Sequence, residues 1–388
     1  MALLQRRNPG DKKLNILLAH SGRWEYPTGI IIGIRGLAEA LADNGHSVKV
    51  VLLGESKSCV QDSIEYVFSP NLLHFIWDVH RQCKGVDVIH CDDTLAVLAS
   101  LSKKNHALIY TNHSVFADPQ FHYSYHEWRS ASMALGPRQR AECITAKILG
   151  QNVLKRADKV LAVSNFVKET VSQIYKVPDS KIEVVFKGIN TRDFIHKEIP
   201  SEQTGGEKIL FLKPNEPRKG LHHLLKALPL VLKEKPELKV IAAGPEPSAD
   251  YGRHIQNLID EYQVSDRVIF TGKVDFAALV SLYLSSDVVT IPSLYEAFAT
   301  VALEAGMCGK PVVASNTGGL TESVVDQETG FLVNVKSPSF FAEAVIKLLS
   351  DESLRERLGE NGRKRVLGNF TWDKIALKIE SIYRAALK

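Results

Sequence analysis

Two glutamates in the second half of the chain have a type and spacing suited to binding a phosphorylated sugar. Glu296 and Glu304 stand eight residues apart in the segment 292–315, PSLYEAFATVALEAGMCGKPVVAS. Residues 300–307 have the pattern of a helix, so we expect Glu296 in the loop before it and Glu304 along it. A helix N-terminus offers free amides to a phosphate, and carboxylates accept hydrogen bonds from sugar hydroxyls. The pair therefore fits a nucleotide-sugar, although the spacing alone fits a capping or surface pair better.

Two nearby turns supply further groups for a phosphate. Gly318 and Gly319 lie in NTGGLTE, directly after a predicted strand, and glycine lets backbone amides approach an anion. Lys219 lies in PRKG, after the first strand of this half and before a helix, where a diphosphate needs a cation. Taken separately, NTGGLTE is equally typical of a plain strand-to-helix turn, and Lys219 of an ordinary surface lysine.

Short apolar runs alternate with amphipathic stretches along the chain and must position these residues. Strands that alternate with helices indicate parallel sheets covered on both faces, so we expect an α/β fold with two doubly wound halves. Ligands of such sheets bind beyond the carboxyl ends of the strands, which makes the cleft between the halves the expected site. The polar segment 198–207, EIPSEQTGGE, is the predicted linker. The predicted strands are 14–20, 47–53, 86–90, 107–112, 159–164, 208–212, 238–243, 268–271, 288–291 and 311–314, and the predicted helices are 32–44, 94–104, 145–156, 221–232, 251–262 and 374–387.

Composition excludes several classes of protein. With 388 residues, 45% of them hydrophobic and 24% charged, the chain is expected to form two globular domains. Its 48 basic and 44 acidic residues give a net charge of +4, which argues against binding to nucleic acid. Five cysteines without a CxxC pair argue against a disulfide framework or a zinc site. We expect a cytoplasmic protein, because no apolar run is long enough to span a bilayer and the first residues do not have the pattern of a signal peptide.

Taken in their order along the chain, the segments around Lys219, Glu296, Glu304 and Gly318 resemble those of the retaining glycosyltransferases of family 4. The GT-B fold of that family has two Rossmann-like domains that face each other across a cleft. The resemblance covers nearly the whole chain and includes ETGFLV at 328–333 and NFTWDKIA at 369–376. It implies an acceptor-binding domain at 1–204 and a donor-binding domain for the nucleotide-sugar at 205–372. It also implies that the last helix, 373–388, packs back on the first domain.

The resemblance assigns roles to residues of the second domain. It implies that Glu296 contacts the transferred sugar, that Glu304 holds the ribose hydroxyls and that Lys219 binds the diphosphate. The turn at Gly318 and Gly319 would supply backbone amides near the donor. Further residues expected at the donor are Lys213, Arg218, Phe298, Ala299 and Thr300.

The chain departs from the family pattern at several of these positions. Lys213-Pro214 stands where Gly-Arg is usual, and proline supplies neither charge nor a donor, so Lys213 or Arg218 would have to substitute for that arginine. Glu296-Ala297-Phe298-Ala299 stands where E-G-F-G is usual, and alanine resists a positive φ. These departures put the geometry around the diphosphate in question.

The first half contributes a glycine loop and two histidines to the resemblance. Gly29 matches the first loop glycine, and Ile30 stands where a second glycine is usual. His90 and His113 each follow a predicted strand; the residue at the place of His113 reaches the donor sugar in the family, whereas packing at a strand end is the better interpretation of His90. The segment 121–129, FHYSYHEWR, fits a stacking platform for a sugar acceptor, a membrane contact or an ordinary amphipathic surface.

We therefore expect a retaining glycosyltransferase that moves a sugar from a UDP- or GDP-sugar to an acceptor hydroxyl. Lys219, Glu296 and His113 are the expected catalytic residues, and no metal is expected because lysine and backbone amides would neutralise the diphosphate. A lipid, a glycan and a small metabolite all stay open as acceptors, as do peripheral membrane association and the oligomeric state. The departures motivate one alternative, a catalytically silent relative that binds a nucleotide-sugar or a partner; an epimerase or a phosphorylase with the GT-B fold is a weaker one.

Overall fold

The chain divides into two compact units, each built from several stretches of sequence. The computed structural model describes residues 12–25, 28–100, 106–129, 135–194 and 207–388, without the side chains of residues 98–100. The first unit comprises the residues up to Ala117, Ala141–Ile189 and Thr371–Lys388, and the second comprises Asp118–Arg140 and Asn190–Phe370. Most of the predicted linker, 198–207, and the predicted boundary at 204 lie outside the described residues.

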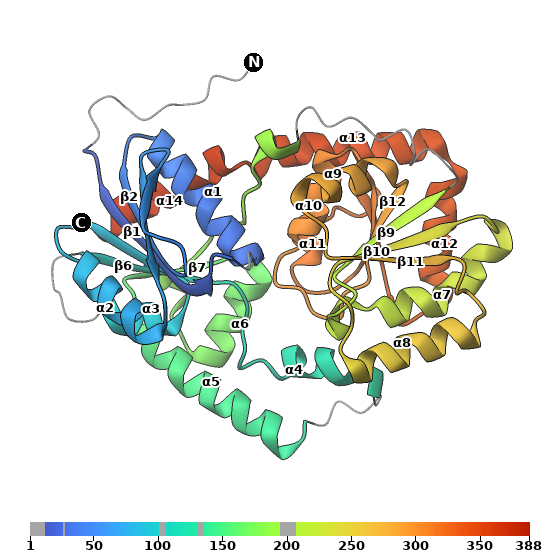
Figure 1. Cartoon of the computed structure of the whole chain (residues 1–388), viewed down its shortest axis with the longest axis horizontal. Coiled ribbons are helices and arrows are strands. Elements are labelled where there is room, and N and C mark those ends of the chain that lie inside the picture. Colours follow the sequence, from blue (N-terminus) through green and yellow to red (C-terminus); the bar gives the residue numbers. More distant parts are fainter. Residues whose placement is uncertain (1–11, 26–27, 101–105, 130–134, 195–206) are drawn as a thin grey trace. The chain divides into compact units, whose positions relative to one another are not determined.

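The first unit contains an eight-stranded sheet in the order β3-β4-β2-β1-β5-β6-β7-β8 (Figure 1). All neighbouring strands run parallel except β3 and β4, which pair antiparallel. Because parallel strands need crossover connections, this order agrees with the alternation of apolar and amphipathic stretches. The strands are β1 Asn15–Arg23, β2 Ser47–Leu53, β3 Cys59–Gln61, β4 Ile64–Ser69, β5 Val88–Cys91, β6 Ala107–Asn112, β7 Lys159–Ala162 and β8 Ile182–Val184.

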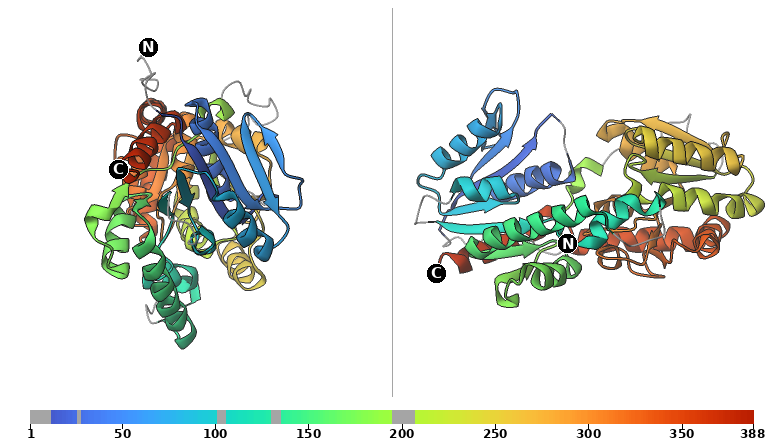
Figure 2. Two further views of the ribbon diagram at one scale, coloured as in Figure 1. Left: turned by 90° about the vertical axis from the view of Figure 1, so that its left-hand side faces the viewer. Right: turned by 90° about the horizontal axis from the view of Figure 1, so that it is seen from below.

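Helices cover both faces of this sheet (Figure 2). A buried core joins alternate residues of β1 and β2 to the apolar faces of α1 and α14, while α2 and α3 pack against the other face of the strands. The helix α5 starts within the second unit and continues into the first. The helices are α1 Gly29–Asp43, α2 Leu72–Gln82, α3 Thr94–Ser100, α5 Pro137–Arg156, α6 Asn165–Tyr175 and α14 Trp372–Ala386.

The C-terminal helix α14 belongs to the first unit, where Trp372 at its start packs against α1. Gly36 of α1 lies so close to the indole of Trp372 that a Cβ atom at this position would overlap the ring. Ile375, Ile379 and Tyr383 of α14 are buried in the same core as Leu37 and other residues of α1. The final helix therefore completes a core whose other residues lie more than 180 positions earlier in the chain.

The second unit contains a six-stranded parallel sheet in the order β11-β10-β9-β12-β13-β14 (Figure 1). Two buried clusters, one on each face, hold the helices to it. The strands are β9 Lys208–Leu212, β10 Lys239–Ala243, β11 Val268–Gly272, β12 Val288–Ile291, β13 Val312–Ser315 and β14 Gly330–Val333. The helices are α4 Pro119–His126, α7 Leu221–Glu234, α8 Ala249–Glu261, α9 Phe276–Ser285, α10 Thr300–Met307, α11 Leu320–Ser323, α12 Pro338–Ser350 and α13 Glu352–Asn369, with the short 3-10 turns η1 Glu127–Arg129, η3 Thr191–Phe194 and η5 Pro217–Lys219.

The structure confirms two doubly wound α/β halves and differs from the sequence analysis in detail. The segment Asp118–Arg140, assigned to the first domain from the sequence, lies in the second unit because its side chains contact α7 and η5. The helix α1 starts at Gly29 rather than at residue 32, since the side chain of Thr28 accepts a hydrogen bond from the amide of Ile31 and caps it. Gly29 and Ile30 are therefore helical rather than part of a loop.

The described part of the chain has two further features that bear on the expectations. It contains no helix with the length and apolar character needed to cross a bilayer. All five cysteines are free; Cys83 and Cys91 are buried, whereas Cys59 is exposed. The absence of a disulfide framework agrees with their spacing.

Candidate active site

The second unit brings Lys219 and Glu296 into direct contact. Nζ of Lys219 donates to Oε2 of Glu296 at 2.5 Å, and both side chains are about nine-tenths buried. Arg218 lies beside them, with its Nη1 at 3.7 Å from the same carboxylate oxygen. Two cations thus converge on one carboxylate, in an arrangement able to hold a sugar hydroxyl and an anion side by side.

A close approach of two turns creates this contact. Gly220 follows η5 with φ +81°, and a Cβ atom there would overlap the carbonyl oxygen of Pro292. The amide of Leu294 donates to the carbonyl oxygen of Arg218 at 2.8 Å, which ties the turn to the loop after β12. Because β9 and β12 are neighbouring parallel strands, the loops at their carboxyl ends meet at one edge of the sheet. Lys219 and Glu296 come from these two loops.

Arg218 is held by several partners around the Lys219–Glu296 pair. Its Nη2 lies 2.7 Å from Oε2 of Glu216, its Nε donates to the hydroxyl of Tyr125 at 2.9 Å, and its Nη1 donates to the carbonyl of Tyr295 at 3.2 Å. Burial opposes the charge of this guanidinium, but the attraction of Glu296 and Glu216 outweighs it and raises the pKa of Arg218. Arg218 therefore supplies a positioned cation next to Lys219.

Opposing effects act on the pKa of the buried Lys219. Burial lowers the pKa of its ammonium group, whereas the nearby carboxylate of Glu296 raises it and the cations Arg218 and Lys213 lower it again. The net direction is downward, so the site favours an incoming negative charge that would compensate the buried cations. A diphosphate is such a charge.

Lys213 occupies a backbone conformation that favours glycine. It follows β9 with φ +61°, and its Nζ lies 3.7 Å from Oε1 of Glu216. The family pattern has glycine at this position, and the left-handed conformation explains that preference. The chain keeps the turn with a lysine, whose charge joins those of Arg218 and Lys219 around Glu216 and Glu296.

The loop before α10 has a geometry that alanine tolerates. Ala299 has φ −92° and ψ 96°, and Ala297 is not among the residues with positive φ. The amide of Ala299 donates to Oγ of Ser323, and the amide of Gly319 donates to the carbonyl oxygen of Glu296 at 2.7 Å. The alanine substitutions therefore require no strained backbone, and the glycine turn braces the loop that carries Glu296.

The remaining predicted residues of this loop lie around the start of α10. Thr300 is its first residue, and Phe298 is buried against Phe370 with ring centroids 5.8 Å apart. Gly318 has φ +49°, and Gly319 is the N-cap residue directly before the short helix α11. These residues shape the backbone around Glu296.

Glu304, one turn further along α10, is paired with a tyrosine. The hydroxyl of Tyr283 donates to Oε2 of Glu304 at 2.6 Å. Burial raises the pKa of this carboxyl, and the bond from Tyr283 opposes that rise. Tyr283 was not identified from the sequence, because a tyrosine in an amphipathic helix is equally typical of a core residue.

The first unit holds a separate cluster formed by the second half of β1 and the residues that directly follow β5 and β6. Nδ1 of His20 lies 2.7 Å from Oδ1 of Asp92 and 3.2 Å from Oδ2 of Asp93, and Nε2 of His113 lies 3.2 Å from Oδ2 of Asp92. Asp92 thus joins the predicted residue His113 to His20, which the sequence analysis did not single out. Burial opposes the charge of His20, but Asp92 and Asp93 outweigh it and raise its pKa to about 10.

Ligand atoms of His20, Asp92 and Asp93 lie within 4.8 Å of one another, close enough to share a cation. In the sequence, these three residues are marked only by their positions at strand ends. His20 ends one predicted strand, and the two aspartates follow another. Burial, the charge of Lys187 and that of His20 lower the pKa of His113, whereas Asp92 raises it. The net shift is downward, so His113 is neutral near pH 7 and able to accept or donate one hydrogen bond at each nitrogen.

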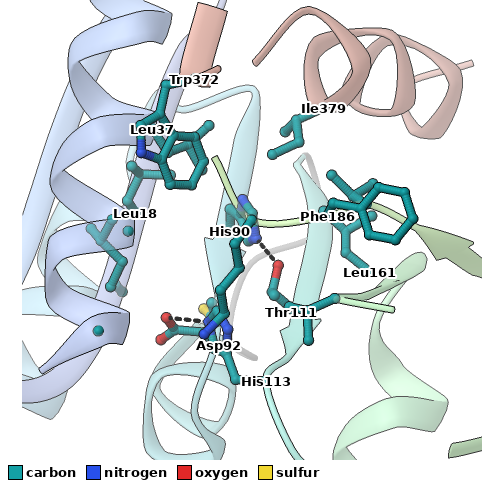
Figure 3. A pocket seen from close by; sticks show the side chains of 18 residues that line it. Leu18, Leu37, His90, Asp92, Thr111, His113, Leu161, Phe186, Trp372 and Ile379 are labelled. Carbon is teal, nitrogen blue, oxygen red and sulfur yellow. Dashed lines mark hydrogen bonds and ion pairs between the residues drawn. The ribbon is translucent and has the colours of Figure 1, made fainter. Parts of the chain in front are cut away.

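A pocket in the first unit opens beside this cluster (Figure 3). Its empty volume, including the part that faces solvent, is about 570 Å³. Figure 3 shows Asp92 and His113 at one end and apolar side chains such as Leu37 and Trp372 at the other. Gly29 also lines it, so Gly29, His90 and His113 share one pocket although they come from three different elements.

His90 has the contacts of a packed residue. Its Nδ1 lies 2.6 Å from the hydroxyl of Tyr383, and its Nε2 lies 2.5 Å from Oγ1 of Thr111. Burial lowers its pKa to about 4, so the ring is neutral near pH 7. These contacts with both ring nitrogens agree with the interpretation of His90 as a histidine packed at a strand end.

Comparison with known proteins identifies the relatives of this chain. The family model described as "Glycosyltransferase Family 4" matches residues 27–193, and the one described as "Glycosyl transferases group 1" matches residues 192–365. An uncharacterized glycosyltransferase of Methanocaldococcus jannaschii is 29% identical, over 94% of this chain and 97% of its own length.

Solved structures share the fold over nearly the whole chain. Sucrose-phosphate synthase from Thermosynechococcus elongatus superposes with a TM-score of 0.77 and 25% identity, over 96% of this chain and 99% of that chain. The Anabaena protein HepE in complex with UDP-glucose superposes with a TM-score of 0.77 and 20% identity, over 96% of this chain and 100% of that chain. Because the two family models together span residues 27–365, this chain belongs to the glycosyltransferases of family 4.

Proposed function

We propose that this glycosyltransferase moves a hexose from a UDP- or GDP-sugar to an acceptor hydroxyl with retention of the anomeric configuration. The observation that carries the proposal is the contact between Lys219 and Glu296 beside Arg218. A lysine and an arginine at the carboxyl edge of the sheet suit a leaving diphosphate, and a carboxylate between them suits a sugar hydroxyl. The complex of Anabaena HepE with UDP-glucose supports a nucleotide-sugar as the ligand of this fold.

Each group of the second unit has a distinct part in the proposal. Lys219 and Arg218 stabilise the negative charge that develops on the diphosphate as the glycosidic bond breaks. Glu296 orients the transferred sugar, and Glu304, held by Tyr283, accepts hydrogen bonds from the ribose. His113 is proposed as the group of the first unit that acts on the sugar, with its ring oriented by Asp92.

In the proposed reaction, Lys219, Arg218 and nearby backbone amides stabilise the diphosphate, and the chemical step uses no metal. Two observations support an active enzyme rather than a silent relative. Arg218 supplies a cation close to Lys219 although Pro214 stands at the place of the usual arginine, and Ala299 has an ordinary backbone conformation.

A donor panel tests the proposal. The full chain is incubated with UDP-glucose, UDP-N-acetylglucosamine, GDP-mannose and ADP-glucose, and released nucleoside diphosphate is measured with and without sugar, polyol and lipid-headgroup acceptors. We expect turnover with one UDP- or GDP-sugar, an α-linked product from an α-linked donor, and loss of about 10²-fold or more in Lys219→Met and Glu296→Gln.

Lys364→Met is the matched control, because Lys364 is exposed on α13 and pairs with Glu360 at 3.8 Å. Its turnover should equal that of the unmodified protein. A β-linked product would contradict retention, and turnover unchanged in Lys219→Met would contradict the role of the pair. An epimerised nucleotide-sugar, or turnover that requires inorganic phosphate, would identify one of the weaker alternatives.

A further inference from the structure

A second cluster of histidines and a carboxylate lies in the second unit, away from the Lys219–Glu296 contact. Glu127 lies in η1, within the segment FHYSYHEWR, and His222 and His223 are the second and third residues of α7. The proposed transfer reaction uses none of the three. Both histidines are at least nine-tenths buried, His222 fully so.

The ligand atoms of this cluster converge on one point. Nε2 of His222 lies 3.1 Å and Nε2 of His223 lies 3.4 Å from the same oxygen, Oε2 of Glu127, and potential ligand atoms of all three residues lie within 4.8 Å of one another. Bonds of about 2.0–2.1 Å to a tetrahedral metal ion place neighbouring ligand atoms about 3.3 Å apart. The distances from the two histidine nitrogens to Oε2 of Glu127 therefore match those between ligands of one ion.

His223 provides an independent sign of a missing ligand. Its Nε2 is buried and, among the described residues, has no partner that meets the geometry of a hydrogen bond, because its approach to Glu127 at 3.4 Å is that of an ion pair only. A buried imidazole nitrogen without a hydrogen bond is costly. A metal ion between His223 and Glu127 would satisfy it.

The neighbours of His222 orient its ring in the way that is typical of histidines in metal sites. Nδ1 of His222 lies 2.8 Å from the hydroxyl of Tyr251, which holds the ring with its Nε2 toward Glu127. Trp128 packs against Tyr251 and His254, with ring centroids 5.4 Å and 5.1 Å away. A hydrogen-bond partner on the second ring nitrogen is typical of a histidine that binds a metal through the first.

We propose that Glu127, His222 and His223 bind one divalent transition-metal ion, with Zn²⁺ as the ion that suits them best. Two imidazoles and one carboxylate are a ligand set of zinc, whereas Mg²⁺ and Ca²⁺ prefer oxygen ligands alone. The fourth position is left to water. The ion joins η1 to the start of α7 and so braces the turn that carries Lys219, three residues before His222.

This site has a structural role in the proposal and takes no part in sugar transfer. The site contains no cysteine, so the spacing of the cysteines, which argued against a zinc site, carries no information about it. The same three residues, with both Nε2–H groups donating to Glu127 and no ion, form the alternative arrangement. Metal binding by the full chain distinguishes the two.

The test measures binding rather than activity. The full chain is stripped with EDTA, dialysed and titrated with Zn²⁺ against a chromophoric chelator, and with Co²⁺ for the visible bands of a tetrahedral site. We expect one equivalent of Zn²⁺ with Kd in the micromolar range or tighter, and a rise in Tm of about 5 °C at 100-fold excess over Kd. Glu127→Gln, which keeps the shape of the side chain, and His223→Gln should each lose this equivalent.

Two further variants make the outcome decisive. His80→Gln, an exposed histidine on α2, should bind Zn²⁺ as the unmodified protein does. His20→Gln removes a ligand from the cluster with Asp92 and Asp93, and should also leave the equivalent intact. No bound zinc in the unmodified chain, or an equivalent that survives in Glu127→Gln and is lost in His20→Gln, would overturn the proposal.

The result is independent of the transferase proposal. Circular dichroism and Tm of the stripped variants show whether Glu127→Gln and His223→Gln still fold, and binding is compared only among folded proteins. Zinc binding without any donor turnover would leave the site intact and count against the proposed reaction alone.

Discussion

Nζ of Lys219 donates to Oε2 of Glu296 at 2.5 Å although 77 residues separate the two in the chain. The two residues lie in the connections that follow β9 and β12, neighbouring strands of the same parallel sheet, and both are largely buried. The packing of two loops of the second unit thus brings the proposed catalytic cation and sugar-binding carboxylate together.

Removal of either partner of this pair should destabilise the protein, and removal of both should cost less than the sum of the two single changes. Lys219→Met leaves Glu296 buried with Arg218 alone and should cost about 3 kcal/mol of unfolding free energy. The double variant Lys219→Met/Glu296→Gln should cost less than the sum of the single changes, with a coupling of about 1–2 kcal/mol in urea unfolding. Additive single effects would show that the contact is not formed in solution.

The left-handed backbone of Lys213 predicts a difference between two substitutions that both remove its charge. Lys213→Gly relieves the strain at φ +61°, whereas Lys213→Ala keeps it. The unfolding free energy of Lys213→Gly should therefore exceed that of Lys213→Ala by about 1 kcal/mol, the reverse of the usual order of glycine and alanine. Urea denaturation of the two variants measures the difference, and equal stabilities would contradict the positive φ.

The bond from Tyr283 to Glu304 predicts a loss of nucleotide affinity when the hydroxyl is removed. Tyr283→Phe deprives a buried carboxylate of its donor and should cost about 1–2 kcal/mol of stability. It should also raise the pKa of Glu304 further, because that bond lowers it. We expect weaker binding of UDP or GDP in calorimetry, most of all at acidic pH. Tyr262→Phe, at a half-exposed tyrosine, is the control and should change neither quantity.

The raised pKa of His20 predicts how stability depends on pH. The folded protein holds the imidazolium between Asp92 and Asp93 up to about pH 10, whereas the unfolded chain releases its proton near 6.5. The stabilisation from this group is therefore complete below pH 6.5 and is lost as pH rises toward 10. Unfolding free energies of the unmodified protein and of His20→Asn should differ by a few kcal/mol at pH 6 and converge by pH 10. A constant difference across this range would contradict the shift.

Much of the fold was predictable from the sequence because its signals are local. The buried strands β1, β2, β9, β10 and β12 are short apolar runs, and their alternation with amphipathic stretches indicates parallel sheets. The strand β3 was missed, since it has only three residues, all exposed, and lacks a core-facing pattern. The strands β4, β8 and β14 were not predicted either. The motif around Glu296 and Glu304 also indicated the family, because its loop and helix residues are consecutive in the sequence.

The tertiary structure alone decided which distant residues share a site. The sequence by itself determined two doubly wound α/β halves, the family, and the positions of Lys219, Glu296 and Glu304 at strand and helix ends. It could not show that Arg218 lies beside Lys219 and Glu296, that Tyr283 donates to Glu304, that Asp92 joins His20 to His113 or that residues 118–140 belong with the second unit. Periodicity encodes which face of an element is buried, whereas contacts across 20 to 100 residues depend on how turns such as Gly220 against Pro292 pack.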